Sequence, residues 1–386
     1  MYGYLVVLFL LRHLVSNPAF QPQTVDSDVA IGYGLALGDV DGDGKVDILL
    51  ADKKQFVWYR NGDWKKFVLA ENLTASDNVC IAARDIDGDG KVEVAVGAQW
   101  NPSETSDTTT SGAVFYLSRP QDPTQPWKAT ELRHEPTVHR MRWVQAAPGN
   151  FHLIVVPLHG RGNQNGAGEG VKVIACIPPA KSRNDAGQWT YALVDQSMHL
   201  THNLEVIPGK KNESIYIGGK EGIKAFQYDG KRWTAVTNKT FVVSGSSVGE
   251  LRKSLEGKLD FIATVEPMHG RELAVYEASE NSNPTRTLLS NELNQGHALA
   301  VADVLASGSN QIVVGWREPN AEKKTGIKLF IPPAKGTTAW TSLWIDENEM
   351  ACEDLQVIDL NGDGKKDIVA AGRATHNLKI YWNSTK

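Results

Sequence analysis

A nine-residue acidic loop that recurs three times between apolar segments is the feature that most constrains the fold of this chain. The copies begin at Asp39, Asp85 and Asp359, and an apolar run lies on either side of each. Glycines at the fourth and sixth positions allow the backbone to curl tightly. Apolar run, short loop and apolar run together predict a β-hairpin at each copy.

Positions one, three, five and nine of each loop all carry side chains with oxygen atoms, which hard cations such as calcium prefer. An EF-hand loop shares the start of this pattern, but it needs a glutamate at position twelve and a helix afterwards. The alternative is an acidic surface turn without metal. We expect three structural calcium sites, none of them catalytic, with these ligands: Asp39, Asp41, Asp43, Asp47, Asp85, Asp87, Asp89, Glu93, Asp359, Asn361, Asp363 and Asp367.

The hairpins belong to a larger unit that recurs, often without its acids, along the whole sequence. Each unit holds about four short apolar segments, and patterns for long amphipathic helices are absent. Four-stranded units repeated four to eight times are typical of β-propellers. We therefore predict an all-β, seven-bladed β-propeller that spans residues 18–386 as one domain, with units that begin at Gly34, Asn78, His139, His202, Gly249, His297 and Glu353.

The two ends of the sequence complete this prediction. The seventh unit stops after its third strand, near Trp382, whereas the segment from Ala19 to Asp26 resembles a fourth strand without a unit. We expect this segment to close the ring and remove an open sheet edge; the alternative is a disordered tail. Residues 1–17 contain an apolar run without a basic start, which we interpret as a degenerate export signal and an extracytoplasmic location.

Composition excludes some partners and leaves others open. The net charge is −5, so there is no basic footprint for nucleic acid. The apolar run at the N-terminus is too short to span a bilayer well, and no other segment qualifies. Cys80, Cys176 and Cys352 cannot all pair and lack metal-site spacing, so we expect buried thiols.

In a propeller the first strand of each blade lines the axial channel, and these strands start on the face opposite the acidic loops. We aligned the units six residues before the first loop acid or its equivalent. This rim is predicted to contain Tyr33, Val79, His139, His202, roughly Ser246, His297 and Glu353. The loops between second and third strands should lie above it, with Gln99, Trp100, His159, Arg161, Lys220, His269, Arg317, Arg373 and His376.

Histidines gathered on one face predict a functional pocket, although they could also simply hydrogen-bond loop backbone around a hydrated channel mouth. Three imidazoles converging on an axis could hold zinc or another divalent metal with an open position. Histidines with a pKa near neutral also suit proton abstraction and return. Arginines and lysines there could stabilise an oxyanion or bind a carboxylate, and Trp100 could stack on a sugar.

Two resemblances sharpen these expectations. The acidic hairpins resemble the FG-GAP or VCBS repeats of calcium-binding propellers. Gln295–Asp303, Thr201–Asn203, Glu353–Leu355 and Ala371–Asn383 resemble the propeller domain of aldos-2-ulose dehydratases. In that family the propeller accompanies cupin domains, and the enzyme dehydrates and isomerises keto-sugars such as 1,5-anhydrofructose. The resemblance implies that dehydration is the step a propeller rim could carry.

Our first hypothesis is therefore a keto-sugar lyase or dehydratase that acts on a small sugar or oligosaccharide. A proton next to a carbonyl is removed and a hydroxyl is eliminated, by residues drawn from His139, His159, His202, His297, Glu353, Arg373 and His376. Substrate contacts are expected from Trp100, Arg161, Lys220, His269 and Arg317. The alternatives are a non-catalytic, calcium-stabilised propeller that binds carbohydrate or protein, and a polysaccharide-cleaving enzyme that uses the same rim.

Overall fold

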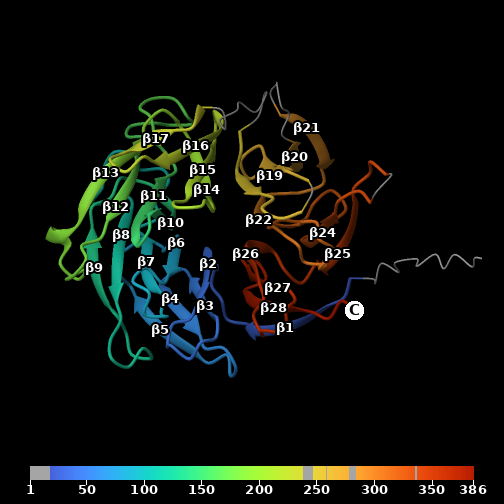
Figure 1. The fold of residues 1–386 in the computed structure, drawn as a ribbon, viewed down its shortest axis with the longest axis horizontal. Coiled ribbons are helices and arrows are strands. Elements are labelled where there is room, and N and C mark those ends of the chain that lie inside the picture. Colours follow the sequence, from blue (N-terminus) through green and yellow to red (C-terminus); the bar gives the residue numbers. More distant parts are fainter. Residues whose placement is uncertain (1–17, 238–246, 258, 278–283, 335–336) are drawn as a thin grey trace, which may run out of the picture.

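The computed structural model describes residues 18–237, 247–257, 259–277, 284–334 and 337–386. These residues form seven four-stranded antiparallel sheets arranged in a ring (Figure 1), as predicted. Blades one to three are β2 (Gly34–Gly38), β3 (Asp47–Ala51), β4 (Gln55–Tyr59) and β5 (Lys66–Glu71); β6 (Cys80–Arg84), β7 (Glu93–Ala98), β8 (Ala113–Ser118) and β9 (Lys128–Leu132); and β10 (Val138–Ala147), β11 (Asn150–Pro157), β12 (Val173–Ile177) and β13 (Thr190–Asp195).

The remaining blades follow in chain order. They are β14 (Thr201–Ile207), β15 (Ser214–Gly219), β16 (Gly222–Tyr228) and β17 (Trp233–Ala235); β18 (Glu250–Lys253), β19 (Phe261–Glu266), β20 (Glu272–Glu277) and β21 (Thr285–Ser290); β22 (Gly296–Ala302), β23 (Gln311–Trp316), β24 (Gly326–Ile331) and β25 (Thr341–Glu347); and β26 (Cys352–Ile358), β27 (Asp367–Gly372) and β28 (Asn377–Asn383) with β1 (Phe20–Asp26). One short 3-10 helix, η1 (Ala186–Gln188), precedes β13.

The ring is closed by the N-terminal strand, as predicted. β1 pairs antiparallel with β28, with Phe20 opposite Asn383 and Thr24 opposite Lys379. The hydroxyl of Tyr59 in blade one donates to Asp26 at 2.6 Å, which ties the closing strand to the first blade. The expected export signal in residues 1–17 lies outside the described residues.

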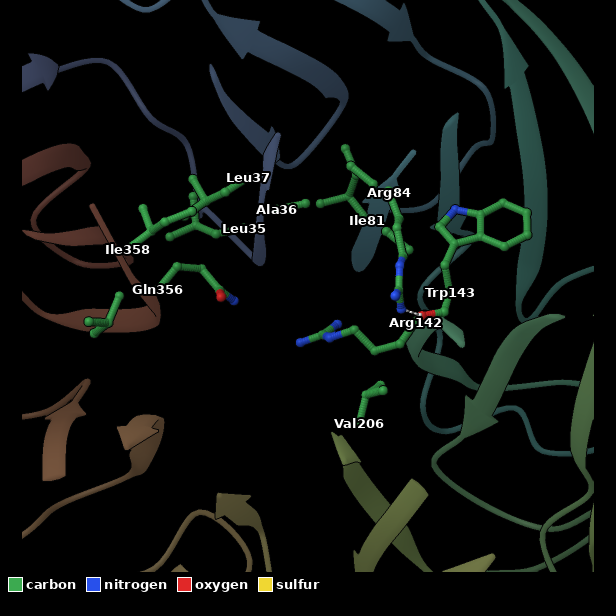
Figure 2. A pocket seen from close by; sticks show the side chains of 13 residues that line it. Leu35, Ala36, Leu37, Ile81, Arg84, Arg142, Trp143, Val206, Gln356 and Ile358 are labelled. Carbon is green, nitrogen blue, oxygen red and sulfur yellow. Dashed lines mark hydrogen bonds between the residues drawn. The ribbon is translucent and has the colours of Figure 1, made fainter. Parts of the chain in front are cut away.

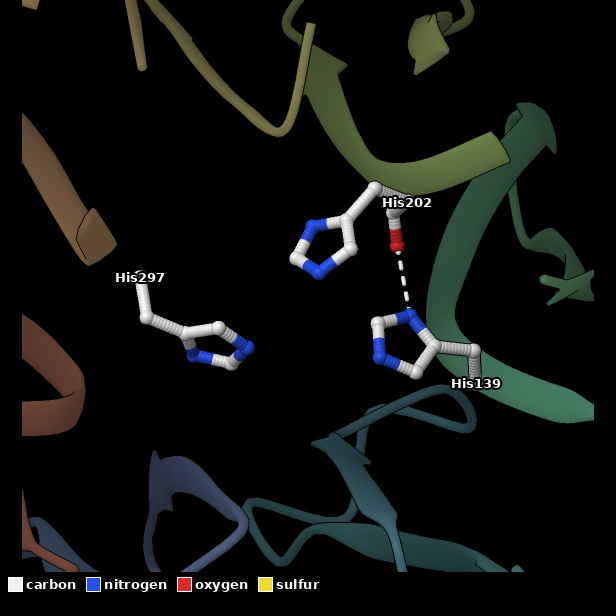
Figure 3. A group of neighbouring side chains, drawn as sticks. All are labelled: His139, His202 and His297. Carbon is white, nitrogen blue, oxygen red and sulfur yellow. Dashed lines mark hydrogen bonds between the residues drawn. The ribbon is translucent and has the colours of Figure 1, made fainter. Parts of the chain in front are cut away.

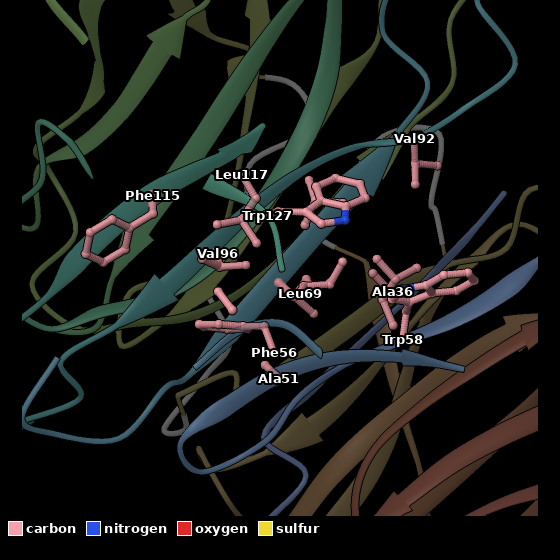
Figure 4. Packing of buried hydrophobic residues seen from close by; sticks show 14 of the residues in the cluster. Ala36, Ala51, Phe56, Trp58, Leu69, Val92, Val96, Phe115, Leu117 and Trp127 are labelled. Atoms are coloured by element: carbon pink, nitrogen blue, oxygen red, sulfur yellow. The ribbon is translucent and has the colours of Figure 1, made fainter. Parts of the chain in front are cut away.

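The hydrophobic core lies between neighbouring blades. Strands β3, β7, β19 and β23 are buried along their whole length, because each middle strand is covered on both faces by adjacent sheets. Between blades one and two, Phe56, Trp58 and Leu69 pack with Val96 and Trp127 (Figure 4). This two-sided burial explains why these strands are continuous apolar runs in the sequence. The cysteines at positions 80, 176 and 352 are free and buried, as expected.

The first strands of neighbouring blades contact one another around the whole ring, from β2 to β6 and on to β26 and back to β2. They therefore line the central channel, with their starts on one face. The acidic loops connect first and second strands on the other face, as the sequence predicted.

Candidate histidine site

Three histidines at the starts of first strands point toward a common centre (Figure 3). The imidazole Nδ1 atom of each one donates to a backbone carbonyl in the next blade. His139 bonds the carbonyl oxygen of His202 at 2.8 Å, His202 bonds that of Gly249 at 3.1 Å, and His297 bonds that of Glu353 at 2.6 Å. With the proton held on Nδ1, the lone pair of each neutral ring lies on Nε2.

The local backbone explains why these side chains face the axis. The pairing of first and second strands shifts register between Val138 and Arg140, and again between Gly296 and Ala298. Similar shifts lie between residues 201 and 204 and between 352 and 354. Each shift falls on His139, His202, His297 or Glu353. A β-bulge re-aims the side chain that it carries, and bulges are common at functional sites.

A fourth histidine completes the cluster. Nε2 of His269, in the loop after β19, lies 2.7 Å from Nε2 of His202. The ring centroids of His269 and His297 are 4.9 Å apart. Trp100 packs against His139, with the two ring centroids 5.1 Å apart. The structure thus brings together four of the predicted histidines and the predicted aromatic residue.

The surroundings of the four histidines favour the neutral form of the imidazole rings. His139, His202 and His297 are at most 4% exposed. Burial lowers the pKa of all three, and nearby arginines lower it further. Burial, followed by the positive charge of neighbouring groups, lowers the pKa of His269 to about 2. These rings are uncharged at neutral pH and can each offer a lone pair.

A buried carboxylate with two arginines adjoins the histidines. Glu353 is 1% exposed, and its oxygens lie 3.3 Å from Arg317 and 3.3 Å from Arg373. Arg317 also donates to the side chain of Gln295 at 2.6 Å, and Arg373 lies over the ring of Tyr33. Two guanidinium groups share one carboxylate here, so the group carries a net positive charge beside the imidazoles.

Four other predicted site residues lie on the same face without contacts to the cluster, and the side chains of three of them have structural partners. Arg161 pairs with Glu135 at 2.6 Å, and Lys220 donates to the carbonyl of Gly166 at 2.6 Å. The exposed His376 bonds the backbone carbonyl of Val29 at 3.0 Å. Nδ1 of His159 is buried, and no partner among the described residues satisfies it.

The predicted alignment placed the rim position of blade five near Ser246, which lies outside the described residues. Gly249 occupies the equivalent place, because its carbonyl accepts from His202 just as the carbonyl of His202 accepts from His139. The first strand of blade five has only four residues, Glu250–Lys253. Counting back six residues from the loop therefore reaches a position before the start of this strand.

A layer of charged residues inside the channel was missed by the sequence analysis. Glu250 lies 3.2 Å from Nδ1 of His202 and 3.5 Å from Arg252, which also lies 3.6 Å from Glu205. Arg140 donates to Nε2 of His139 at 3.3 Å. The available signal was the alternation of charges within strands that would otherwise be apolar, because alternate residues of an inner strand face the axis.

The acidic loops share one hydrogen-bond pattern. The first aspartate accepts backbone N–H groups from both loop glycines, as Asp39 does from Gly42 at 2.6 Å and Gly44 at 2.7 Å. The ninth residue turns back to accept the N–H of the second, as Asp47 does from Val40 at 2.8 Å. Acids grouped closely enough to hold one ion are Asp39, Asp41 and Asp43 in the first loop and Asp85, Asp87 and Glu93 in the second.

Two observations qualify the calcium expectation. In blade six Gln311 accepts the N–H of Val304, and Asp303 accepts that of Gly308, so the same loop shape forms without acids at positions three and five. In the second loop Arg183 lies 2.9 Å from Asp87 and 3.7 Å from Glu93. Calcium binding therefore stays a prediction, and the second loop already contains an internal cation.

No helix among the described residues has the length and hydropathy needed to cross a membrane. The family described as aldos-2-ulose dehydratase, beta-propeller domain, matches residues 111–279, and the FG-GAP-like repeat matches residues 39–96. The first match includes His139, His202 and His269, and the second includes two acidic loops. Both resemblances drawn from the sequence are thereby confirmed.

A curated protein named aldos-2-ulose dehydratase, from Phanerodontia chrysosporium, is 22% identical to this chain over 275 residues. The alignment covers 61% of this chain and 29% of that protein, so the chain spans less than a third of its relative. Among solved structures, a chain of a mitotic checkpoint complex crystal structure matches with a TM-score of 0.58 and 10% identity, covering 99% of this chain and 96% of that one. The latter likeness concerns the fold alone.

Proposed function

We propose that this chain is a carbohydrate-active lyase that removes water from a keto-sugar at the histidine site. The observation that carries the proposal is the meeting of His139, His202, His269 and His297 at one mouth of the channel. The similarity to the propeller domain of aldos-2-ulose dehydratase supports the reaction class.

His297 is the best candidate for the base. Nε2 of His139 accepts from Arg140, and Nε2 of His202 faces His269. Among the described residues nothing is hydrogen-bonded to Nε2 of His297, while its Nδ1–H is fixed on the carbonyl of Glu353. A carbon-bound proton next to the sugar carbonyl would pass to this lone pair, leaving an enolate.

The arginines beside Glu353 suit the charge that then develops. Because burial lowers the pKa of His297, the imidazole is a weak base, and the enolate oxygen needs strong stabilisation. Arg317 and Arg373 lie next to this histidine through their shared contact with Glu353. The β-hydroxyl leaves as water after protonation, for which His159 and His376 on the same face are the candidates, and a conjugated enone remains.

A divalent cation is the rival use of the same histidines. One ligand atom from each of His139, His202 and His297 lies within 4.8 Å of the others, and each ring has its other nitrogen fixed on a carbonyl. Such outer hydrogen bonds orient metal-binding imidazoles. Zinc there would act as a Lewis acid on the sugar carbonyl. Zinc would also occupy the lone pair of His297, so a chelator distinguishes the two roles. Loss of turnover on metal removal would indicate that the histidines are metal ligands. Unchanged turnover would indicate that His297 acts as the base.

The test is an ultraviolet assay for a conjugated enone with 1,5-anhydrofructose and a panel of keto-sugars. We expect rising absorbance with at least one sugar, and a loss of at least about a hundredfold in His297→Gln. His199→Gln is the matched control, because the His199 ring is partly exposed and pairs with Glu221, away from the cluster. Full activity of folded His297→Gln would sink the assignment. Sugar binding without product would favour the non-catalytic carbohydrate-binding alternative.

A further inference from the structure

A cavity occupies the channel on the side of the acidic loops, away from the histidines. It has a volume of about 330 Å³ and is lined by residues of β2, β6, β10, β14 and β26 (Figure 2). Its walls are largely aliphatic, with Leu35, Ile81, Val206 and Ile358 among them. Its polar side chains are Arg84, Arg142 and Gln356.

Arg142 forms no close ion pair within the described part of the chain. Its Nη1 donates to the carbonyl of Met141 at 2.8 Å, and no carboxylate of the described residues lies within ion-pair distance of it. Across the cavity, the amide of Gln356 has no hydrogen-bond partner among the described residues. Figure 2 shows both side chains reaching into the cavity from opposite sides.

Several other charged residues of the channel already have partners. Arg84 binds both oxygens of Glu213, at 2.8 and 3.0 Å. Glu205 and Glu250 flank Arg252. Asp354 accepts the backbone N–H groups of residues 35 and 355.

Burial lowers the pKa of Arg142, and the like charge of Arg252 adds to this effect. Asp354 and Glu205 offset part of this effect from beyond ion-pair distance. A guanidinium group that is partly desolvated and makes no close ion pair still carries an electrostatic cost that a bound anion would reduce.

We propose that this cavity binds a small organic carboxylate. The planar guanidinium of Arg142 matches a carboxylate with two parallel hydrogen bonds, and the amide N–H of Gln356 provides a further donor. The aliphatic walls receive the hydrocarbon part of the ligand. A doubly charged phosphate would meet only one unpaired cation and would leave the apolar walls uncovered. This site lies apart from the histidines and goes beyond the proposed lyase activity.

The test compares butyrate with its neutral analogue butyramide, and with phosphate and chloride, as stabilisers against thermal unfolding of the full chain. Butyrate at millimolar concentration should raise the midpoint temperature of unfolding, since a ligand stabilises only the state that binds it. Butyramide, phosphate and chloride should leave this temperature unchanged. Calorimetric titration of butyrate should give one site per chain.

Arg142→Gln should abolish the butyrate effect, and Gln356→Leu should weaken it at least threefold. Arg232→Gln is the matched control, because the side chain of Arg232 is 80% exposed. His297→Gln should respond to butyrate like the wild type, so this site and the lyase proposal can fail separately. Equal stabilisation by butyramide or phosphate overturns the proposal, as does an undiminished response in Arg142→Gln. If Arg142→Gln does not fold, Gln356→Leu is the deciding variant. An undiminished response of Gln356→Leu to butyrate then overturns the proposal.

Discussion

Nε2 of His202 and Nε2 of His269 lie 2.7 Å apart, although 67 residues separate them in the chain. His202 already donates its Nδ1–H to Gly249, so the neutral ring has no proton on Nε2 and His269 must be the donor. Between two neutral rings, this contact is a hydrogen bond from His269 to His202. A metal ion that binds His202 has to replace this bond.

This relationship predicts how zinc binding responds to mutation. The variants His139→Ala, His202→Ala and His297→Ala should each lower the affinity for zinc at least tenfold, because each removes one of three ligands. His269→Ala should retain one zinc per cluster, because the three ligands remain. Calorimetric titration, with Co²⁺ absorption as a second readout, checks this. Equal loss in His269→Ala would make it a fourth ligand, and unchanged binding in all four variants would refute the metal site.

Arg183 predicts unequal calcium affinity among the acidic loops. It lies 2.9 Å from Asp87, and Arg119 lies 4.0 Å from Asp89, so the second loop is partly neutralised from within the protein. Removing a competing ion pair is worth about 1 kcal/mol, and Arg183→Gln should therefore tighten one calcium site by about fivefold to tenfold. Calcium titration of the chelated protein measures this, with Arg232→Gln as control. Identical titrations for Arg183→Gln and the wild type would contradict it.

Glu353 should matter for stability as well as for chemistry. Glu353→Gln leaves Arg317 and Arg373 without their shared carboxylate, and removing one partner of a buried ion pair costs about 3 kcal/mol or more. The control is Glu347→Gln, which disrupts the half-exposed pair with Lys324 and should cost less than about 1 kcal/mol. Urea unfolding gives both values. An unchanged free energy of unfolding in Glu353→Gln would show that Arg317 and Arg373 find other partners.

His152 predicts a pH dependence of stability that is independent of the histidine site. It is 1% exposed and accepts from the indole of Trp233 at 3.2 Å. Burial lowers its pKa from 6.5 to about 4, so between these values the unfolded chain binds more protons than the folded one. The free energy of unfolding should therefore fall as pH falls through this window, by up to about 3 kcal/mol.

The His152→Gln variant isolates this contribution, because glutamine can still accept from Trp233 but does not titrate. Unfolding in urea at several pH values between 4 and 7 should show a shallower pH dependence in the variant than in the wild type. Parallel curves would mean that folding does not lower the pKa of His152, as expected if solvent reaches the ring in the folded protein.

The sequence by itself determined the blades and the face on which function was sought. Each blade is built from neighbouring segments joined by short turns, so the repeated loop at Asp39, Asp85 and Asp359 and the apolar runs beside it were sufficient. The closing strand could be predicted because an open edge beside β28 needed a partner. The face of His139, His202 and His297 followed from their equal position in each unit.

Only the tertiary structure decided which side chains meet. His202 touches His269, and Arg183 enters a loop 96 residues away, because the ring brings different blades together at the axis and at their edges. The bulge at each rim histidine and the unpaired guanidinium of Arg142 depend on register and on packing across the channel. Periodicity in one strand specifies which face is buried, but the neighbours on that face come from other strands, and their distances exist only once the ring has closed.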